Sequence, residues 1–450
     1  MSKKYDYDVI VIGGGTAGLG AYRKAKSKGK KALIIEANDF VTTCANVGCM
    51  PSKLLIAAAE NRESINKSAQ FGIDVKEVTI NNEVLWNRVR SERDRFVGFV
   101  KKGAYSIDEK DRMIGFAKFK SANTIEVNGK EITSEVFVIA TGSRPIYLDI
   151  FNHIKDEILT NENVFELDKV PESIAVFGAG VIGLELGFAF KNLGSEVHMF
   201  SRGSHLLRLN KDINDYLVKH IEEEMSFEYE HSVEKIDKVE NGYRLYWNNQ
   251  SKDFKKILVA IGRKANIDNL NIESWVKEGN ILNMFNRKTM QIGNYPIFLA
   301  GDVNNDVTLL HEASKEGIIA GENASSYPDV KEYKRNVLLS VVFSSPQIMQ
   351  VGNTVHKEED VIKGTVSFED QGRSRVMLKN KGMMNVYFDK KNHLLLGAEM
   401  IGPDAEHIGH TLAWIIEKGT TLEEILEFPF YHPVVEEGVR TAMRDAFSKI

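Results

Sequence analysis

The sequence has few cysteines, no excess of positive charge and no long apolar run. Its 450 residues include 58 Lys and Arg against 63 Asp and Glu, for a formal net charge of −5, so the composition does not favour nucleic-acid binding. The mean hydropathy is −0.26, and no apolar stretch approaches the roughly 18 residues of a membrane span. We therefore expect no membrane segment.

The N-terminal residues MSKKYDYDVIVIGGG lead directly into an expected strand and leave no room for a targeting segment. This predicts a cytoplasmic protein in a reducing compartment, where a structural disulfide is unusual. The hydrophobic content of 43% supports real cores, and a chain of this length is expected to form about two to four domains.

The only two cysteines lie close together in residues 42–53, TTCANVGCMPSK. A zinc site would need further Cys or His ligands, but the chain has no other Cys and its 11 His are scattered, so we expect no metal site. A structural disulfide across so short a loop would constrain little of the unfolded chain. Chance burial of two small apolar side chains is the remaining structural explanation. We instead expect Cys44 and Cys49 to take part in redox chemistry.

A bridge between these cysteines requires an irregular backbone. Residues five apart in a regular helix have Cα atoms about 8 to 9 Å apart, whereas a disulfide needs less than about 7 Å. We expect Gly48 to allow unusual dihedral angles and Pro51 to disfavour a regular helical interior. A disulfide held in such a bend is suited to opening and closing during catalysis.

The first of two glycine-rich segments predicts a dinucleotide-binding unit near the N-terminus. The strand DVIVI (8–12) leads into Gly13, Gly15 and Gly18, then into a helix and a second strand that ends at Glu36. Glycines at this spacing let the backbone approach a pyrophosphate at a helix N-terminus, and the acidic residue can bind ribose hydroxyls.

The same glycine pattern recurs about 165 residues further along the chain. The strand SIAVF (173–177) is followed by Gly178, Gly180 and Gly183, a helix, and the strand EVHMF. An unrelated Gly-rich turn could explain one such unit but explains two poorly. Two dinucleotide sites in one chain predict two cofactors that exchange electrons.

The second unit differs from the first at the end of its second strand. Ser201 occupies the position that corresponds to Glu36, and Arg202 and Arg208 follow it. Arginines accommodate a 2′-phosphate, whereas a carboxylate favours NAD, so we expect NADPH here, although the third glycine is more typical of NAD sites. The competing interpretation is that both arginines are solvated surface charges.

Taken in order, these motifs resemble the flavoprotein (class I) pyridine nucleotide-disulfide oxidoreductases, the family of dihydrolipoamide dehydrogenase, glutathione reductase and mercuric reductase. The resemblance covers essentially the whole chain. Its further markers are ATGSRP (140–145), VAIGRKAN (259–266), IFLAGDV (297–303), TLLHEASKEG (308–317) and FYHPVVEE (430–437).

The resemblance implies an α/β fold with two Rossmann-like domains, one for FAD and one for NAD(P), and a C-terminal α+β dimerisation domain. The implied boundaries are 1–150 for the first part of the FAD domain, 151–268 for the NAD(P) domain, 269–335 for the second FAD part and 336–450 for dimerisation. It also implies a homodimer.

The resemblance also implies a role for each catalytic residue. Cys49 would face the flavin as the charge-transfer thiol, and Cys44 would exchange with the substrate disulfide. His432 would act across the subunit interface as the acid–base, oriented by Glu437; a nearby histidine can take the proton from a thiol, because only the thiolate attacks a disulfide.

Further residues are assigned to the cofactors by the same resemblance. Asp302 would hold the ribityl chain of the flavin, and Lys53 would lie near the flavin, paired with Glu185. The remaining implied cofactor contacts are Thr43, Thr141, Gly142, Gly262 and Ala313.

Within the family, the sequence is most like dihydrolipoyl dehydrogenase. Residues 51–53 (PSK) are typical of that enzyme, and the C-terminal end RTAMRDAFSKI lacks the extra cysteines of mercuric and high-molecular-weight thioredoxin reductases. The arginines after the second unit favour an NADPH-dependent glutathione reductase-like enzyme instead. Two further hypotheses are an FAD-dependent oxidase or quinone reductase and a binding subunit without turnover.

Two departures from the family pattern weaken any link to an oxo-acid dehydrogenase complex. Residues 40–43 (FVTT) replace the usual Leu-Gly-Gly-Thr, and Phe430 stands where dehydrogenases commonly have another histidine. A place in such a complex is therefore only weakly expected.

Overall fold

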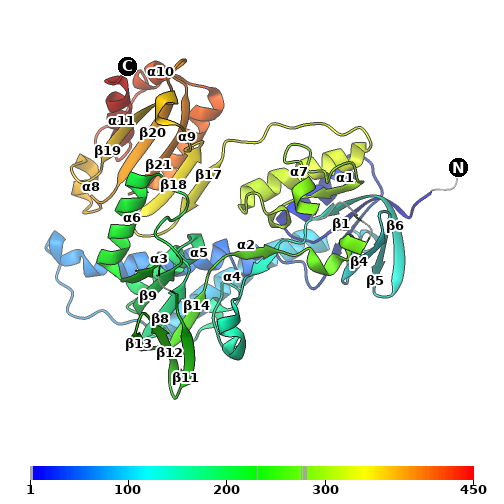
Figure 1. Ribbon diagram of the computed structural model, residues 1–450, viewed down its shortest axis with the longest axis horizontal. Helices are drawn as coiled ribbons and strands as arrows, with labels where there is room; N and C mark the ends of the chain where they lie inside the picture. Colours follow the sequence, from blue (N-terminus) through cyan, green and yellow to red (C-terminus); the bar gives the residue numbers. More distant parts are fainter. Residues whose placement is uncertain (1–3, 231, 275, 277–280) are drawn as a thin grey trace. The chain divides into compact units, whose positions relative to one another are not determined.

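The computed structural model describes residues 4–230, 232–274, 276 and 281–450 (Figure 1). The chain divides into two compact units, each built from separate stretches of sequence. Unit 1 contains residues 1–54, 86–146 and 262–335, and unit 2 contains residues 55–85, 147–261 and 336–450. Helices α3 (Cys49–Asn66) and α4 (Asn82–Tyr105) each contribute residues to both units.

Unit 1 is built on a parallel sheet in the order β3-β2-β1-β6, with β16 beside the second half of β6. The first half of β6 continues into an antiparallel meander with β5 and β4. The strands of this unit are β1 (Tyr7–Ile12), β2 (Ala32–Glu36), β3 (Arg112–Ile114), β4 (Ala117–Ser121), β5 (Thr124–Val127), β6 (Lys130–Ile139), β7 (Ser143–Pro145), β15 (Arg263–Ala265) and β16 (Ile297–Leu299).

Strand β1 is apolar on both sides because both faces of the parallel sheet are covered. Val9 and Val11 pack toward α1 (Thr16–Ser27) and α7 (Leu310–Ser326), whereas Ile10 and Ile12 pack into a second core with residues of β4 and β5. Figure 1 shows α1 and α7 side by side. A Cβ on Gly317 would overlap the Ala17 carbonyl oxygen, so the two helices approach backbone to backbone.

Unit 2 contains a second parallel sheet, in the order β10-β9-β8-β14, and an antiparallel sheet of β11, β12 and β13. The strands are β8 (Ser173–Phe177), β9 (Glu196–Ser201), β10 (Ser226–Tyr229), β11 (Lys235–Val239), β12 (Gly242–Trp247), β13 (Gln250–Phe254) and β14 (Lys256–Val259). Helices α5 (Val181–Asn192) and α6 (Lys211–Glu224) follow β8 and β9 respectively.

The C-terminal part of unit 2 is a five-stranded antiparallel sheet, β17-β18-β21-β20-β19, packed against helices. Its elements are β17 (Leu339–Val342), β18 (Gln347–Gly352), β19 (Val361–Ser367), α8 (Gly372–Val376), β20 (Met383–Asp389), β21 (Leu395–Gly402), α9 (Ala405–Lys418), α10 (Leu422–Leu426) and α11 (Glu437–Phe447). The predicted fold class is therefore confirmed: two Rossmann-like units and a C-terminal α+β domain.

The described helices include none that is long and apolar enough to cross a membrane. The cytoplasmic location stays a prediction.

A buried histidine in β9 is expected to make the stability of unit 2 dependent on pH. His198 stacks on Phe200 with ring centroids 4.6 Å apart and meets Trp247 edge-on at 5.0 Å. Neither ring nitrogen has a hydrogen-bond partner among the described residues, and the nearest carboxylate, Glu228, is 3.7 Å away. Burial, helped by Lys252, lowers the pKa of His198 to about 4 from its ordinary value of 6.5.

The sign of the effect follows from proton uptake. In the unfolded chain His198 takes up a proton below about pH 6.5, whereas in the folded chain it does so only below about pH 4. The free energy of unfolding is therefore highest above about pH 6.5 and falls as the pH drops from about 6.5 to about 4. We expect a loss of about 2 to 3 kcal/mol. The Tm of His198→Phe, relative to that of the wild type at the same pH, should therefore rise as the pH falls from about 7.5 to about 4.5. A difference that stays constant with pH would contradict this.

Candidate active site

The two cysteines lie on either side of a break between two helices. Helix α2 (Thr43–Asn46) is capped by Thr42, whose side chain accepts a hydrogen bond from the Ala45 N–H at 3.2 Å. The chain then leaves helical geometry, and α3 begins at Cys49. The predicted irregular backbone between the cysteines is confirmed.

The reasons expected for this irregularity were wrong. Gly48 is not among the glycines with positive φ; a Cβ at this position would instead lie 2.9 Å from the Thr43 carbonyl oxygen and 3.2 Å from the Cys44 Cα. Glycine is therefore needed for close packing inside the break. Pro51 is the third residue of α3, where no intrahelical N–H is required, so it starts a helix rather than disrupting one.

Cys44 and Cys49 are in contact as thiols. Cys44 is half-buried and Cys49 is exposed. A hydrogen bond to Cys49, followed by burial, raises the pKa of Cys44, and the positive charge of Lys53 opposes the shift. Negative charge on Cys49 is favoured by its place at the first residue of α3. The N-terminus of α3 and the charge of Lys53 therefore both favour a thiolate in this pair.

The first glycine-rich loop has the shape of a cradle at the N-terminus of α1. Gly13 has a φ of 109°, and a Cβ on Gly18 would overlap the Gly13 carbonyl oxygen, so both positions require glycine. Gly15 precedes α1, and a Cβ there would meet nothing within 4 Å. Glu36 accepts a hydrogen bond from the Gly14 N–H at 2.6 Å. This open helix terminus fits a pyrophosphate.

The second loop repeats this geometry. Gly178 has a φ of 104°, a Cβ on Gly183 would overlap the Gly178 carbonyl oxygen, and Gly180 before α5 faces open space. Gly183 is thus a requirement of packing, whichever nicotinamide nucleotide binds. Both loops fit the dinucleotide cofactors that the sequence predicts.

Asp302 lies in a network that joins the end of β16 to the paired strands β7 and β15. The Ser143 hydroxyl donates to Asp302 Oδ2 at 2.9 Å, and Arg263 Nε donates to that hydroxyl at 2.8 Å. Thr141 donates to the Asn266 carbonyl oxygen at 2.6 Å. Sequence reasoning missed Ser143 and Arg263, although both lie inside motifs that it singled out.

A buried carboxylate holds the turn at Asp302 through hydrogen bonds. Glu316 is fully buried and accepts from the Gly301 N–H and from Asn304 Nδ2, both at 2.7 Å. Burial raises the pKa of Glu316, and its ion pair with Arg335 partly offsets this shift. Neither Glu316 nor Arg335 carries a pattern that the sequence alone could reveal.

The other predicted cofactor residues of unit 1 are placed as follows. Gly142 and Gly262 both have positive φ, of 69° and 125°, and Ala313 is buried beside Gly301. Thr43 is exposed at the start of α2. Contact of these residues with a cofactor stays a prediction.

Exposed cations follow β9, the second strand of the second glycine-rich segment. Ser201 closes β9, and its hydroxyl donates to the Gly203 carbonyl oxygen at 2.8 Å. Arg202 and Arg208 follow in a loop and are both exposed. Both the NADPH prediction and the interpretation as solvated charges stay open at this point.

A histidine–carboxylate pair is placed as predicted near the C-terminus. His432 Nδ1 lies 3.0 Å and 3.1 Å from the two carboxylate oxygens of Glu437, the first residue of α11. This hydrogen bond is the main cause of the lowered pKa of Glu437. The imidazole is 81% exposed, so its other nitrogen is open to a reacting group.

Glu185 is buried in α5 and accepts from the Phe343 N–H at 3.1 Å. Lys53, in α3, belongs to unit 1, whereas Glu185 belongs to unit 2. Their pairing stays a prediction.

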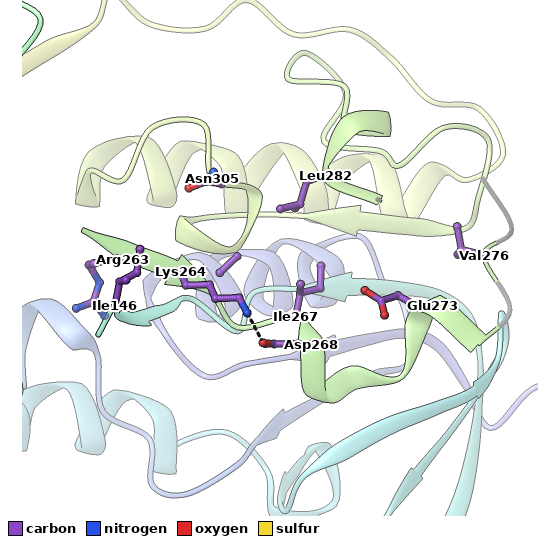
Figure 2. Close-up of a pocket in the computed structure, with 10 residues that line it drawn as sticks. Ile146, Arg263, Lys264, Ile267, Asp268, Glu273, Val276, Leu282 and Asn305 are labelled. Carbon is purple, nitrogen blue, oxygen red and sulfur yellow. Dashed lines mark ion pairs between the residues drawn. The ribbon is translucent and has the colours of Figure 1, made fainter. Parts of the chain in front are cut away.

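A pocket of about 620 Å³ in unit 1 was not predicted. Figure 2 shows its lining, in which Lys264 pairs with Asp268 at 2.8 Å. Its lining is Ile146, Arg263, Lys264, Ala265, Ile267, Asp268, Glu273, Val276, Leu282 and Asn305. None of the predicted cofactor or catalytic residues is in that set.

The described residues include no cluster of three or more His, Cys, Asp or Glu side chains that could hold a metal ion.

Comparison with known proteins agrees with this geometry. The chain is 30% identical over 450 residues to the dihydrolipoyl dehydrogenase of Geobacillus stearothermophilus, with 96% of this chain and 94% of the relative covered. It is 28% identical over 455 residues to a mercuric reductase of Staphylococcus aureus, with 97% and 82% covered.

Two solved structures share the fold. One is an HOCl-induced flavoprotein disulfide reductase of Escherichia coli, a mutant solved as a Cu(II) complex, with a TM-score of 0.80, 22% identity, and coverage of 99% of this chain and 100% of that chain. The other is LpdA of Mycobacterium tuberculosis, with a TM-score of 0.84, 21% identity, and coverage of 97% and 99%.

Residues 7–317 match the family described as pyridine nucleotide-disulphide oxidoreductase, and residues 338–443 match its dimerisation domain, which supports a homodimer. Use of FAD and of a pyridine nucleotide is a property of this family. The chain therefore belongs to the pyridine nucleotide-disulphide oxidoreductases and is a dihydrolipoyl dehydrogenase-like flavoprotein enzyme.

Proposed function

We propose that the enzyme passes electrons between NADPH and a small disulfide or dithiol of the lipoamide type through Cys44 and Cys49. The observation that carries this proposal is the contact between the two thiols across the break between α2 and α3. This arrangement holds both sulfur atoms where a disulfide can form and break with little movement of the backbone.

The two sulfur atoms have separate tasks in this proposal. Cys44 loses its proton to His432 and attacks the substrate disulfide, forming a mixed disulfide and releasing one substrate thiolate. His432 returns the proton to that thiolate. Cys49 then attacks the Cys44 sulfur, which forms the Cys44–Cys49 disulfide and releases the second substrate thiolate. Because the pKa of Cys44 is raised, the first step needs a base.

FAD, when bound, would take a hydride from the nicotinamide and supply the two electrons that reduce the Cys44–Cys49 disulfide. The residues proposed to hold it are those of the first cradle and the Asp302 turn: Gly13, Gly15, Gly18, Glu36, Thr43, Lys53, Thr141, Gly142, Gly262, Asp302 and Ala313. Gly178, Gly180, Gly183, Ser201, Arg202 and Arg208 are proposed to bind the nicotinamide nucleotide, and Glu185 to pair with Lys53.

We propose that His432 serves the cysteine pair of the second subunit. The support is its place in the dimerisation domain, its high exposure and its fixed ring orientation. Hydrogen bonding of Nδ1 to Glu437 leaves Nε2 to take and return the proton. Association with an oxo-acid dehydrogenase complex stays a prediction.

The domain boundaries are proposed to follow the sequence motifs. Residues 1–150 and 269–335 would form the FAD domain, residues 151–268 the NAD(P) domain and residues 336–450 the dimerisation domain.

Steady-state turnover of the purified holoenzyme tests this function. Lipoamide and oxidised glutathione would each be offered with NADPH and with NADH. The proposal expects lipoamide to be the better disulfide. Preference for glutathione would favour a glutathione reductase-like enzyme, and turnover only with oxygen or quinones would favour an oxidase.

The nucleotide preference is tested at the exposed arginines. Arg208→Ala should raise the Kd for NADPH about tenfold, because a charge-assisted hydrogen bond to the 2′-phosphate is lost, and should change NADH binding little. Binding would be followed by quenching of flavin fluorescence. An equal loss for both nucleotides, or no loss for NADPH, would show that the arginine is a solvated charge.

A further inference from the structure

The loop that carries the two arginines has a defined shape. This nucleotide loop, residues 201–210, connects β9 to α6. The Leu206 N–H donates to Asn214 Oδ1 at 2.7 Å, and Asn214 Nδ2 donates to the Ser204 carbonyl oxygen at 2.9 Å. Leu206 and Leu209 are buried beneath the loop. The middle of the loop is therefore tied to the first turn of α6.

The backbone of the nucleotide loop is strained where it presents Arg208. Leu207 and Arg208 have φ values of 53° and 58°, in the left-handed region that side chains other than glycine rarely adopt. Such residues persist only where the surroundings hold them, and they gather at ligand sites. Among the described residues, neither Arg202 nor Arg208 has a side-chain partner. The strained backbone thus presents Arg208 as a cation with no counter-charge among the described residues.

The C-terminal end of the loop is fixed by the dimerisation domain. Asn210 is the N-cap residue of α6, yet its side chain makes no capping bond, although this is a preferred role of asparagine. Its Nδ2 donates instead to Glu399 Oε1 at 2.5 Å, the Thr354 carbonyl oxygen at 2.8 Å and the Tyr387 hydroxyl at 2.9 Å. The Asn210 N–H also lies 3.1 Å from Glu399 Oε1.

Glu399 is well placed to hold Asn210 at the end of the nucleotide loop. It lies in β21, is 0% exposed, and accepts a hydrogen bond from the Tyr387 hydroxyl of β20 at 3.1 Å. Figure 1 shows α6 beside the sheet that contains these strands.

Further contacts in the same polar cluster also hold α6. Asp212 accepts from Asn385 Nδ2 at 3.0 Å and pairs with Lys363. Loss of Glu399 would therefore loosen the end of the loop while leaving the helix docked.

We propose that Glu399 is a positioning residue for the nicotinamide nucleotide: by holding Asn210, it keeps Arg208 where it meets the 2′-phosphate of NADPH. The inference rests on the proposed function of the nucleotide loop. It makes a carboxylate of the dimerisation domain part of the selectivity for one nucleotide over the other.

The test compares Glu399→Gln with a matched control in the same polar cluster. Thr365→Val removes a hydroxyl that donates to Asn385 Oδ1 at 3.0 Å and has no contact with Asn210 among the described residues. Glu399→Gln should raise the Kd for NADPH about tenfold, change that for NADH less than about twofold, and leave kcat at saturating NADPH in place. Thr365→Val should leave the ratio of the two Kd values unchanged.

The double variant separates positioning from general loss of stability. If Glu399 acts through Arg208, adding Glu399→Gln to Arg208→Ala should cause no further loss of NADPH binding. Two outcomes would overturn this inference but leave the proposed nucleotide preference standing. One is a double variant in which the losses of NADPH affinity from the two single variants multiply; the other is an equal loss of affinity for NADPH and NADH in Glu399→Gln. If Arg208→Ala by itself leaves NADPH binding unchanged, the proposed nucleotide preference falls and this inference falls with it.

Discussion

Cys44→Ser should lower disulfide turnover by about 1,000-fold or more, because serine cannot form the mixed disulfide with the substrate. The fold should survive, since Cys44 lies in the short α2 and the replacement is nearly isosteric. Lipoamide reduction by the purified holoenzyme is the measurement. Reduction of a quinone by NADPH should be retained, because that reaction does not need the sulfur atom of Cys44.

Cys49→Ser is the matched comparison. It should also abolish disulfide turnover, but only this variant should lack the long-wavelength absorbance of a thiolate beside the flavin; Cys44→Ser should keep it. If Cys44→Ser retains lipoamide turnover, the division of tasks between the sulfurs is wrong.

His432→Gln should lower lipoamide turnover by about 100- to 10,000-fold, the usual contribution of a general acid–base. The physical reason is the raised pKa of Cys44, which leaves little thiolate unless a base takes its proton. The side chain is 81% exposed, so its replacement should not disturb folding. The expected signature is a loss of kcat with lipoamide while flavin reduction by NADPH stays fast.

Carboxylates near His432 supply the controls. Glu437→Gln should cause a smaller loss than His432→Gln, because the imidazole remains but is held less firmly. Glu436→Gln, at the neighbouring position, should have no effect. Mixing the His432→Gln and Cys44→Ser proteins adds a test of the subunit interface: heterodimers that carry one intact pair should recover activity. Full activity of His432→Gln would contradict the proposed role.

Local patterns explain what the sequence could predict. The strand, glycine turn, helix and strand of residues 8–36 are contiguous, so their spacing alone specifies a cradle such as that at Gly13 and Gly15. His432 and Glu437 are likewise close in sequence, and their contact was predictable. The break between Cys44 and Cys49 followed from helix geometry, although the parts played by Gly48 and Pro51 did not.

Contacts between distant segments were beyond sequence reasoning. Ser143 meets Asp302 across 159 positions, and Asn210 meets Glu399 across 189. No periodicity or spacing marks such pairs, because they depend on how separate sheets pack. Glu316 illustrates the same limit: a glutamate on a helix is ordinarily expected in solvent, yet its burial supports the turn at Asp302.

An anaerobic titration of the holoenzyme with NADPH, followed in the visible spectrum and completed by adding lipoamide, tests the central role of the cysteine pair most directly. The account predicts a long-wavelength absorbance band from the Cys49 thiolate at two electrons, absent in Cys49→Ser and discharged by lipoamide. Bleaching of the flavin without that band, and without a response to lipoamide, would place both cysteines outside the path of the electrons.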